Sequence, residues 1–292
     1  MLASALRFFL LIELAIYMAM AMRVFDLDVL PAIVATLAVL LGQRAGIIAT
    51  TYAVAVAHHS PAPPLGWLRA VRMVLAEYFA FLRLFLVVQP WERLWMGEDR
   101  LQPHGGRLLL LIHGYGCNRA AWWWLRHRLE AAGFLVATVN LEPLYVDIDH
   151  YVTAIDTRIE AACQAACCDR LTLVGHSMGG LAARAYLERH GVARVDQLVT
   201  LATPHAGSVL ARMGMGANAR QMEPGSSWLK SLWLHHPDLP MVALRNSHDN
   251  FVIPQDNQRF PGALDIELSG VGHLAMLFSA RTEKALLAAL QR

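Results

Sequence analysis

Short, almost continuously apolar runs alternate with amphipathic stretches through the last two thirds of the chain. The apolar runs predict strands near residues 107–112, 134–140, 171–175, 197–202, 240–245 and 264–268. The stretches between them predict helices near residues 119–132, 148–168, 178–190 and 275–291. Strands that are apolar along their whole length and that alternate with helices are typical of a parallel sheet covered on both faces. The pattern therefore predicts an α/β fold with a doubly wound, mostly parallel sheet.

The first hundred residues follow a different pattern, because long apolar segments replace the short strands. Segment 4–22 is long enough to cross a bilayer, but Glu13 lies at its centre. On an insertion scale its Leu, Ile and Phe residues contribute about −2.4 to −4.8 kcal/mol and a central carboxylate costs about +2.5 to +3.5 kcal/mol, so insertion nearly breaks even. Segment 29–48 is the better candidate for a span, since its one charge, Arg44, lies near its end. The alternative is that Gln43 and Arg44 divide this segment.

Segment 4–22 is either a signal peptide or one arm of a helical hairpin. Ala19-Met20-Ala21 has the small-x-small form of a signal cleavage site. The second apolar segment follows almost at once, which favours an uncleaved hairpin whose arms are joined by residues 23–28.

Segment 67–88 predicts a helix that lies in the membrane interface. Arg69, Arg72 and Arg83 fall on one face at helical spacing, and Leu, Phe and Trp residues occupy other positions. A helix with this distribution suits an interface better than a span.

The composition agrees with a chain made of two such regions. Among 292 residues, 56% are hydrophobic and only 16% are charged, which is more apolar than an ordinary soluble domain. Residues 1–100 are predicted to be an all-α region of anchoring and interfacial helices, and residues 101–292 to be the catalytic domain. A net charge of +2 without a basic tract gives no reason to expect a nucleic-acid partner.

The spacing of cysteines and histidines gives no reason to expect a metal or a disulfide. The chain has four cysteines, Cys117, Cys163, Cys167 and Cys168. No two of them form a C-x-x-C pair, and free thiols mildly favour a reducing compartment. The pairs His58-His59 and His235-His236 are adjacent in sequence, so the side chains of each pair point to different faces, and no carboxylate or cysteine accompanies them at ligand spacing. Neither a metal nor a cofactor is expected.

A glycine-flanked serine follows the third predicted strand. Residues 175–180 read Gly-His-Ser-Met-Gly-Gly and lead into the helix near 178–190. Gly175 and Gly179 leave room for a tight turn, so the hydroxyl of Ser177 projects outward, and the free amides at the helix start stabilise negative charge beside it. The pattern predicts a nucleophile elbow with Ser177 as the nucleophile; the alternative is a tight turn without chemistry.

A serine nucleophile of this kind needs a carboxylate and a histidine, in that order, further along the chain. Asp249 directly follows the fifth predicted strand and is the candidate acid. His273 follows the sixth predicted strand, precedes the last helix and is the candidate base. Asp256 and Asp238 are rival carboxylates.

An oxyanion loop is predicted after the first strand, where residues 113–116 read His-Gly-Tyr-Gly. A tetrahedral intermediate needs two N–H donors that are already directed at its oxygen. The backbone N–H groups of Tyr115 and of Met178, the residue after the candidate nucleophile, are the expected pair.

Two further features flank these motifs. His113 and His176 are interpreted as hydrogen-bonding neighbours of the catalytic loops, and His205 as part of the pocket wall. Residues 206–236 form a long connection that is either a cap or lid supplying the acyl pocket or an insertion that completes the core. Its large apolar residues are Met213, Met215, Met222, Trp228 and Trp233.

Together these motifs resemble those of α/β-hydrolases of the bacterial lipase and esterase type. The matching segments are HGYG at 113–116, GHSMGG at 175–180, LATPHAG at 201–207, SHDNFVIP at 247–254 and GVGH at 270–273. They lie within residues 104–292, and the first hundred residues have no counterpart in that core. The resemblance implies a minimal α/β-hydrolase core with a triad of Ser177, Asp249 and His273 and an oxyanion hole formed at Tyr115 and Met178.

The resemblance implies a membrane-anchored serine hydrolase that cleaves carboxylic esters, with lipid or other acyl esters as substrates and no cofactor. A thioesterase, an amidase or an acyltransferase would use the same triad, and a catalytically idle membrane interaction module is the alternative from another class. We expect a bacterial inner membrane as the location. A hairpin with both ends on its arginine-rich side places the catalytic domain in the cytoplasm, whereas a crossing by residues 67–88 would place it in the periplasm.

Overall fold

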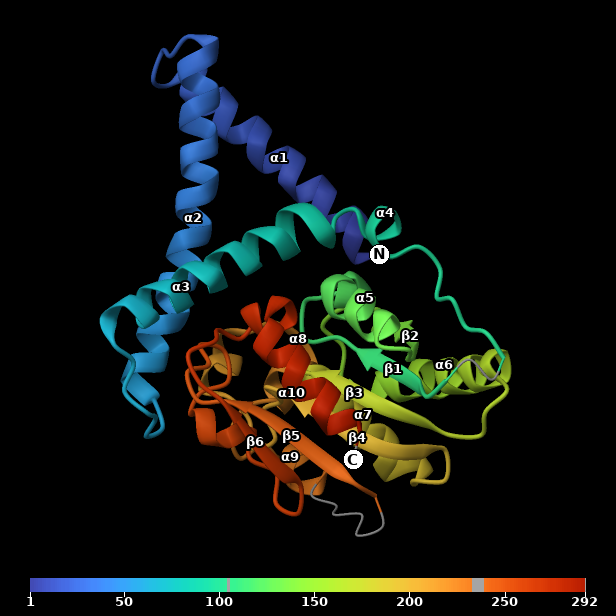
Figure 1. Cartoon of the computed structure of the whole chain (residues 1–292). Helices are drawn as coiled ribbons and strands as arrows, with labels where there is room; N and C mark the ends of the chain where they lie inside the picture. The colour runs from blue at the N-terminus through green and yellow to red at the C-terminus, as the bar shows by residue number, and fades with distance from the viewer. Residues whose placement is uncertain (104–105, 233–238, 292) are drawn as a thin grey trace.

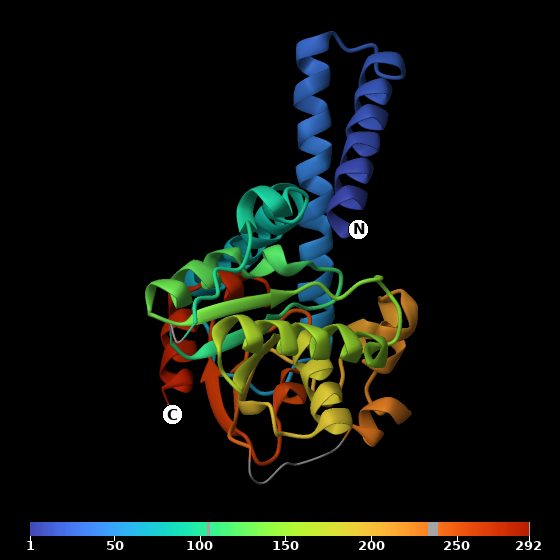
Figure 2. The same ribbon diagram turned by 90° about the vertical axis from the view of Figure 1, so that its right-hand side faces the viewer.

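A computed structural model describes residues 1–103, 106–232 and 239–291 of the chain. It consists of an α/β region and a helical N-terminal region, part of which rises from the α/β region as a hairpin (Figure 1, Figure 2). The two regions are the ones that the apolar patterns predict.

The α/β region is built on a six-stranded sheet with the order β2-β1-β3-β4-β5-β6. Every neighbouring pair of strands is parallel, so the predicted fold class is confirmed. The strands are β1 (Leu108–Ile112), β2 (Leu135–Val139), β3 (Leu171–His176), β4 (Val195–Leu201), β5 (Met241–Asn246) and β6 (Leu264–Leu268). All six lie within a few residues of their predicted positions.

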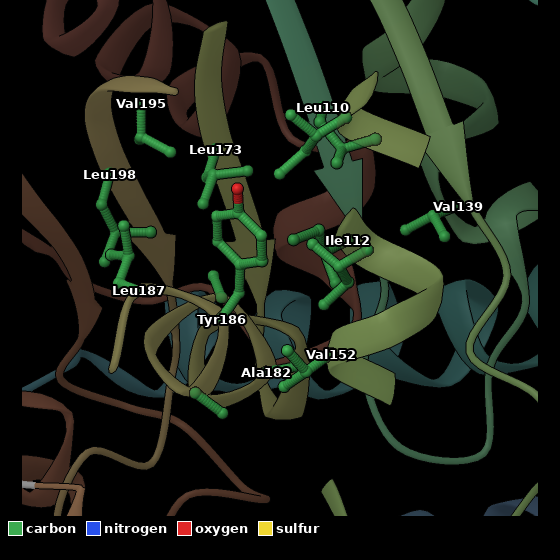
Figure 3. Close-up of a cluster of buried hydrophobic side chains, with 14 of the residues drawn as sticks. Leu110, Ile112, Val139, Val152, Leu173, Ala182, Tyr186, Leu187, Val195 and Leu198 are labelled. Atoms are coloured by element: carbon green, nitrogen blue, oxygen red, sulfur yellow. The ribbon is translucent and has the colours of Figure 1, made fainter. Parts of the chain in front are cut away.

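The sheet is apolar on both faces because alternate residues of each strand point in opposite directions. Leu110 and Leu173 belong to one core cluster and Leu109 and Val174 to another. The first cluster is filled from α6 (Tyr151–Ala166) and α7 (Met178–His190), as Figure 3 shows in part, and the second from α5 (Trp123–Ala131) and α10 (Ala280–Leu290). Helices therefore cover both faces, as in a doubly wound sheet.

The N-terminal region begins with two long helices, α1 (Leu2–Arg23) and α2 (Val29–His58). Both are long and apolar enough to cross a membrane. The alternative that Gln43 and Arg44 divide the second segment is wrong, since α2 continues unbroken through them. The guanidinium group of Arg44 is paired with the carboxylate of Glu13 on α1, so the charge is neutralised inside the hairpin and does not interrupt the helix.

Helix α3 (Trp67–Leu82) follows and continues through a π-helical turn over Arg83–Val88, after which comes the short helix α4 (Glu92–Met96). Ala80 and Leu84 are buried in the same core cluster as α5 and α10. Helix α3 lies across the base of the hairpin and against the α/β region (Figure 1). The predicted interfacial helix is thus also a packed element of the α/β region.

The described part of the long connection after β4, up to residue 232, contains three short helical segments, Val209–Met213, α8 (Gly216–Gln221) and α9 (Ser227–Ser231). Met222, Leu229 and Leu232 are buried in the core, whereas Met213 and Met215 are 66% and 65% exposed. This segment therefore both completes the core and presents apolar side chains at the surface. Trp233 lies outside the described residues.

Candidate active site

Ser177 occupies the turn between β3 and α7 with φ 55° and ψ −127°. A positive φ is rare for a residue with a side chain and marks a strained backbone. The turn is tight: a Cβ atom on Gly179 would lie 2.1 Å from the carbonyl oxygen of Ile112, and one on Gly175 would lie 2.5 Å from the backbone of Gly180. The side chain of Ser177 stays partly exposed. The local geometry is that of the predicted elbow.

His273 and Asp249 are joined by a hydrogen bond of 2.8 Å from Nδ1 of the imidazole to Oδ2 of the carboxylate. The other carboxylate oxygen accepts the backbone N–H groups of Phe251 at 2.7 Å and Val252 at 2.8 Å. Asp249 is completely buried, so its carboxylate is held rigidly in one orientation. This bond assigns the proton to Nδ1 of His273 and leaves Nε2 as an acceptor.

Two opposing effects set the pKa of His273. Burial disfavours the imidazolium, but the adjacent charge of Asp249, its hydrogen bond and the more distant Glu77 favour it, and the net effect raises the pKa above its ordinary value. Asp249 thereby stabilises the protonated form that a general base must pass through.

The rival carboxylate Asp256 lies at the surface, where it pairs with Arg259 at 2.9 Å. Asp238 lies outside the described residues. The structure therefore brings Asp249, and not Asp256, to the histidine that the sequence selects.

The histidines beside these loops are buried and hydrogen-bonded. Nδ1 of His113 donates to the carbonyl of Gly114 at 2.9 Å, and its Nε2 accepts the N–H of Leu141 at 3.0 Å. Burial lowers the pKa of His113 to about 4, so this ring stays neutral while it ties β1 to β2. His176 donates from Nε2 to the carbonyl of His273 at 3.2 Å, and burial lowers its pKa as well.

His205 is buried within a separate group of side chains. It makes a hydrogen bond of 3.1 Å with the hydroxyl of Thr200, and Arg184 lies 3.3 Å from its Nδ1. Its ring stacks on Phe260 with 4.6 Å between the ring centroids. These contacts give it a packing role.

The predicted oxyanion loop runs directly against the serine turn. A Cβ atom on Gly114 would lie 3.0 Å from Cβ of Ser177. Met178 is the first residue of α7, and the N–H of a first helical residue has no acceptor within its helix. The side-chain hydroxyl of Tyr115 makes hydrogen bonds to the carbonyl and the N–H of Met215, which fix this loop to the connection after β4. The assignment of Tyr115 and Met178 as oxyanion donors stays a prediction.

Sequence reasoning missed Glu77, which reaches the histidine loop from α3. Its carboxylate accepts the N–H groups of Leu274 at 2.9 Å and Ala275 at 2.8 Å, the two residues after His273. Glu77 is completely buried, and burial raises its pKa to about 7 against the effect of these two bonds. A Cβ atom on Gly272 would lie 2.2 Å from the Glu77 carboxylate, so only glycine fits there.

Helix α2 also reaches the histidine loop, through Asn250. The side-chain oxygen of Asn250 accepts the backbone N–H of His273 at 3.1 Å, and its amide group donates to the hydroxyl of Thr51 at 2.8 Å. Further along the chain, the backbone N–H of Ser60 donates to the side-chain oxygen of Gln255 at 2.9 Å, and its hydroxyl accepts the N–H of Asp256 at 2.9 Å. Residues from the N-terminal region thus support the loops of both His273 and Asp249.

The described residues contain no group of three His, Cys, Asp or Glu side chains that could hold a metal ion. His235 and His236 lie outside the described residues.

Comparison with protein families and with solved structures shows which known proteins the chain resembles. Residues 109–234 match the family model of palmitoyl protein thioesterase. No curated protein matches the chain at a significant level. The structure of the Bacillus licheniformis lipase BlEst2 in mature form superposes with a TM-score of 0.58 at 17% identity, covering 66% of this chain and 95% of that one.

Two further structures are similar. Lipase B of Aspergillus fumigatus has a TM-score of 0.57 at 14% identity over 64% of this chain and 53% of that one. A bromoperoxidase from Bacillus anthracis has a TM-score of 0.52 at 16% identity over 67% of this chain and 94% of that one. This chain therefore spans about half the length of the fungal lipase.

The chain thus has the α/β-hydrolase fold, as the sequence motifs predict. Within that class it resembles lipases and thioesterases, a group whose fold supports ester hydrolysis in general.

Proposed function

We propose that the chain is a membrane-anchored serine hydrolase that cleaves carboxylic esters of lipids or of other apolar acyl compounds. The observation that carries this proposal is the pairing of a buried His273–Asp249 couple with a strained, partly exposed serine in the same fold. Strain of this kind is kept where a side chain must be presented in one orientation.

In the proposed mechanism, Oγ of Ser177 attacks the ester carbonyl while Nε2 of His273 takes its proton. The N–H groups of Tyr115 and Met178 stabilise the oxyanion. His273 then gives the proton to the leaving alcohol, and a water molecule activated by the same histidine hydrolyses the acyl-enzyme.

The anchor in this proposal is the hairpin of α1 and α2. Both of its ends are tied to the catalytic region, since the N-terminal amine lies 2.7 Å from Glu142 and Thr51 bonds to Asn250. The hairpin would therefore enter and leave the bilayer from the side on which the catalytic region lies. Glu77 and Leu84 are buried against that region, which favours α3 as an interfacial helix over a third crossing, and the positive-inside rule then favours the cytoplasmic side of a bacterial inner membrane.

A thioester is the second candidate for the bond that is cleaved. The match of residues 109–234 to palmitoyl protein thioesterases favours it, and the same triad would serve. Turnover of p-nitrophenyl esters and of acyl-coenzyme A thioesters of equal chain length, measured side by side, separates the two.

A fluorophosphonate probe tests the proposed nucleophile on the full-length protein. It should label the parent and the exposed-serine control Ser231→Ala, and fail to label Ser177→Ala. Turnover of a short soluble ester should fall on the order of 10⁴- to 10⁶-fold in Ser177→Ala, because triad members act as one unit. Labelling of Ser177→Ala would assign the nucleophile elsewhere, and an unlabelled, inactive parent would favour the interaction module.

A further inference from the structure

A hollow of about 780 Å³ lies between α3 and the segment Ser269–Arg281, and we call it the α3 hollow. Arg69 and Arg72 of α3 and Arg83 of the π-helical turn that continues it line one side of the hollow, and Arg281 of α10 lines the other. No aspartate or glutamate is among its lining residues. Four positive charges that face one space repel each other, so this arrangement favours an anion between them.

The arginines keep N–H groups free for such an anion. Arg281 is held in place by hydrogen bonds from its two terminal nitrogens to the carbonyls of Ser269 at 2.8 Å and Gly270 at 2.9 Å. The guanidinium group of Arg83 lies over the ring of Phe278, 4.9 Å from its centroid. Within the described part of the chain, no ion pair or hydrogen bond of the side chains of Arg69 and Arg72 is found. Guanidinium groups bind phosphate oxygens with two parallel N–H donors, which makes phosphate a fitting ligand.

The surroundings of the hollow are apolar. Its remaining lining includes Met73, Ala80, Val271, Ala275 and Phe278. The outward face of α3 next to it exposes large apolar side chains, Trp67 (74%), Leu68 (53%), Val71 (48%) and Leu75 (49%). A cationic rim beside an unpaired apolar helix face is complementary to an amphiphile that carries a phosphate and acyl chains.

The position of α3 puts this face where a bilayer would begin. The hydroxyl of Tyr78 donates to the carbonyl of Leu41 on α2 at 3.0 Å, so α3 is fixed against the hairpin. Figure 1 shows α3 crossing the base of the hairpin, between the protruding helices and the α/β region. Headgroup phosphates of a bilayer that receives the hairpin would lie at this level.

From these observations we infer that the α3 hollow is a binding site for the phosphate of a phospholipid headgroup. The inference rests on the membrane anchoring proposed above but not on ester hydrolysis. The far wall of the hollow is the loop that contains His273, since Gly270, Val271 and Ala275 line it. A bound headgroup therefore contacts both the loop that contains His273 and the interfacial helix α3.

Calorimetric titration of the full-length Ser177→Ala protein in dodecyl maltoside micelles tests this inference, because the substitution prevents hydrolysis of the probe. The probes are dioctanoyl phosphatidylglycerol, glycerol 3-phosphate and inorganic phosphate. The lipid should bind more tightly than either soluble phosphate, since only the lipid also covers the apolar face. Adding Arg69→Gln and Arg72→Gln should weaken lipid binding by at least about tenfold, the effect of losing charge-assisted hydrogen bonds.

Arg100→Gln with Arg189→Gln is the matched control, because it removes two exposed charges that do not line the hollow. The control should bind the lipid as the parent does. Equal weakening in both double variants would reduce the effect to general charge attraction and overturn the site. Equal affinity for inorganic phosphate and lipid would overturn the claim that the bound phosphate belongs to a lipid. Absence of lipid binding in the parent would overturn the inference while leaving the hydrolase proposal intact.

Discussion

The two halves of the helical N-terminal region differ in what their polar groups contact. In the outer part of the hairpin, Glu13 pairs with Arg44 and the hydroxyl of Thr36 lies 4.0 Å from the sulfur of Met18, so these polar side chains find partners within the hairpin. Near the start of α1, Arg7 instead donates to the carbonyl of Pro90. From Thr51 onward, polar groups of the N-terminal region bind the loops around the candidate triad instead. The polar side chains in the outer part of the hairpin, residues 13–44, therefore pair with each other, whereas those of the second half are built into the catalytic region.

The apolar side chains differ as well, although α3 also exposes Trp67 and Leu68. Phe8, Phe9 and Leu11 of α1 are exposed by 60%, 65% and 67%, whereas Leu84 and Val88 are almost completely buried. Exposed apolar surface of this extent is suited to a bilayer, and buried apolar surface is protein core. The division at residue 100 stays a prediction, but the contacts assign the residues from Thr51 onward to the catalytic unit.

The largest effect is expected from shortening the chain, and it depends on which residues are removed. Removing residues 1–100 uncovers the core beneath Leu84, and each large side chain removed from a core costs about 2–5 kcal/mol, against a total of about 5–15 kcal/mol for a domain. We expect no soluble, active protein. Deleting only residues 14–43, with a short Gly-Ser linker between Glu13 and Arg44, keeps the bonds of Thr51 and Glu77 to the catalytic loops.

This shortened protein should turn over a soluble ester at a rate close to that of the full chain, but carbonate washing should release it from vesicles while the full chain stays bound. Both properties are measured on the same preparation. If the shortened hairpin is as inactive as the protein without residues 1–100, the catalytic region depends on the outer part of the hairpin.

The sheet and the candidate triad could be predicted because their signals are local. The elbow is complete within residues 175–180, and Asp249 and His273 each follow a strand that is recognisable by its own apolar run. Local patterns also suggested a break at Arg44, which the structure does not have because Glu13 on the other helix neutralises the charge.

The support from the N-terminal region could not be predicted, since its contacts join distant parts of the chain. Glu77 binds residues that are 197 and 198 positions away. Its only local signal is that it is the one acidic residue between Asp28 and Glu92, on a helix that otherwise carries arginines. An isolated carboxylate in an apolar segment indicates a buried partner but does not identify it.

Glu77→Ala should give the next largest effect. It leaves the N–H groups of Leu274 and Ala275 without an acceptor, at about 1–3 kcal/mol each. We expect kcat for a soluble ester to fall on the order of 10- to 100-fold, the rate equivalent of one such loss, with KM little changed. Glu188→Ala on the exposed side of α7 is the control. A lower melting temperature with unchanged kcat would limit Glu77 to a structural role.

A smaller effect is expected on the pH profile. His273 must be neutral to accept a proton, so kcat/KM should rise with pH through an ionisation above the ordinary value for histidine, because the net effect of burial and Asp249 raises this pKa. Glu77, whose own pKa is about 7, also raises the pKa of His273 where its carboxylate is ionised, so Glu77→Gln should move the acid limb to lower pH. The limb is measured as kcat/KM from pH 5 to pH 9. An acid limb that does not move would show that the charge of Glu77 has no effect on the pKa of His273.

The smallest effect is expected at the contact between α2 and the acid loop. Thr51→Val keeps the shape of the side chain but leaves the amide of the fully buried Asn250 without its acceptor, which costs about 1–3 kcal/mol. Because Asn250 also holds the backbone N–H of His273, we expect a loss of kcat of about three- to tenfold. Thr50→Val is the matched control, since among the described residues the hydroxyl of Thr50 bonds only to the carbonyl of Gly46 in its own helix. Equal kcat values for the two variants would mean that α2 touches the catalytic region without supporting its chemistry.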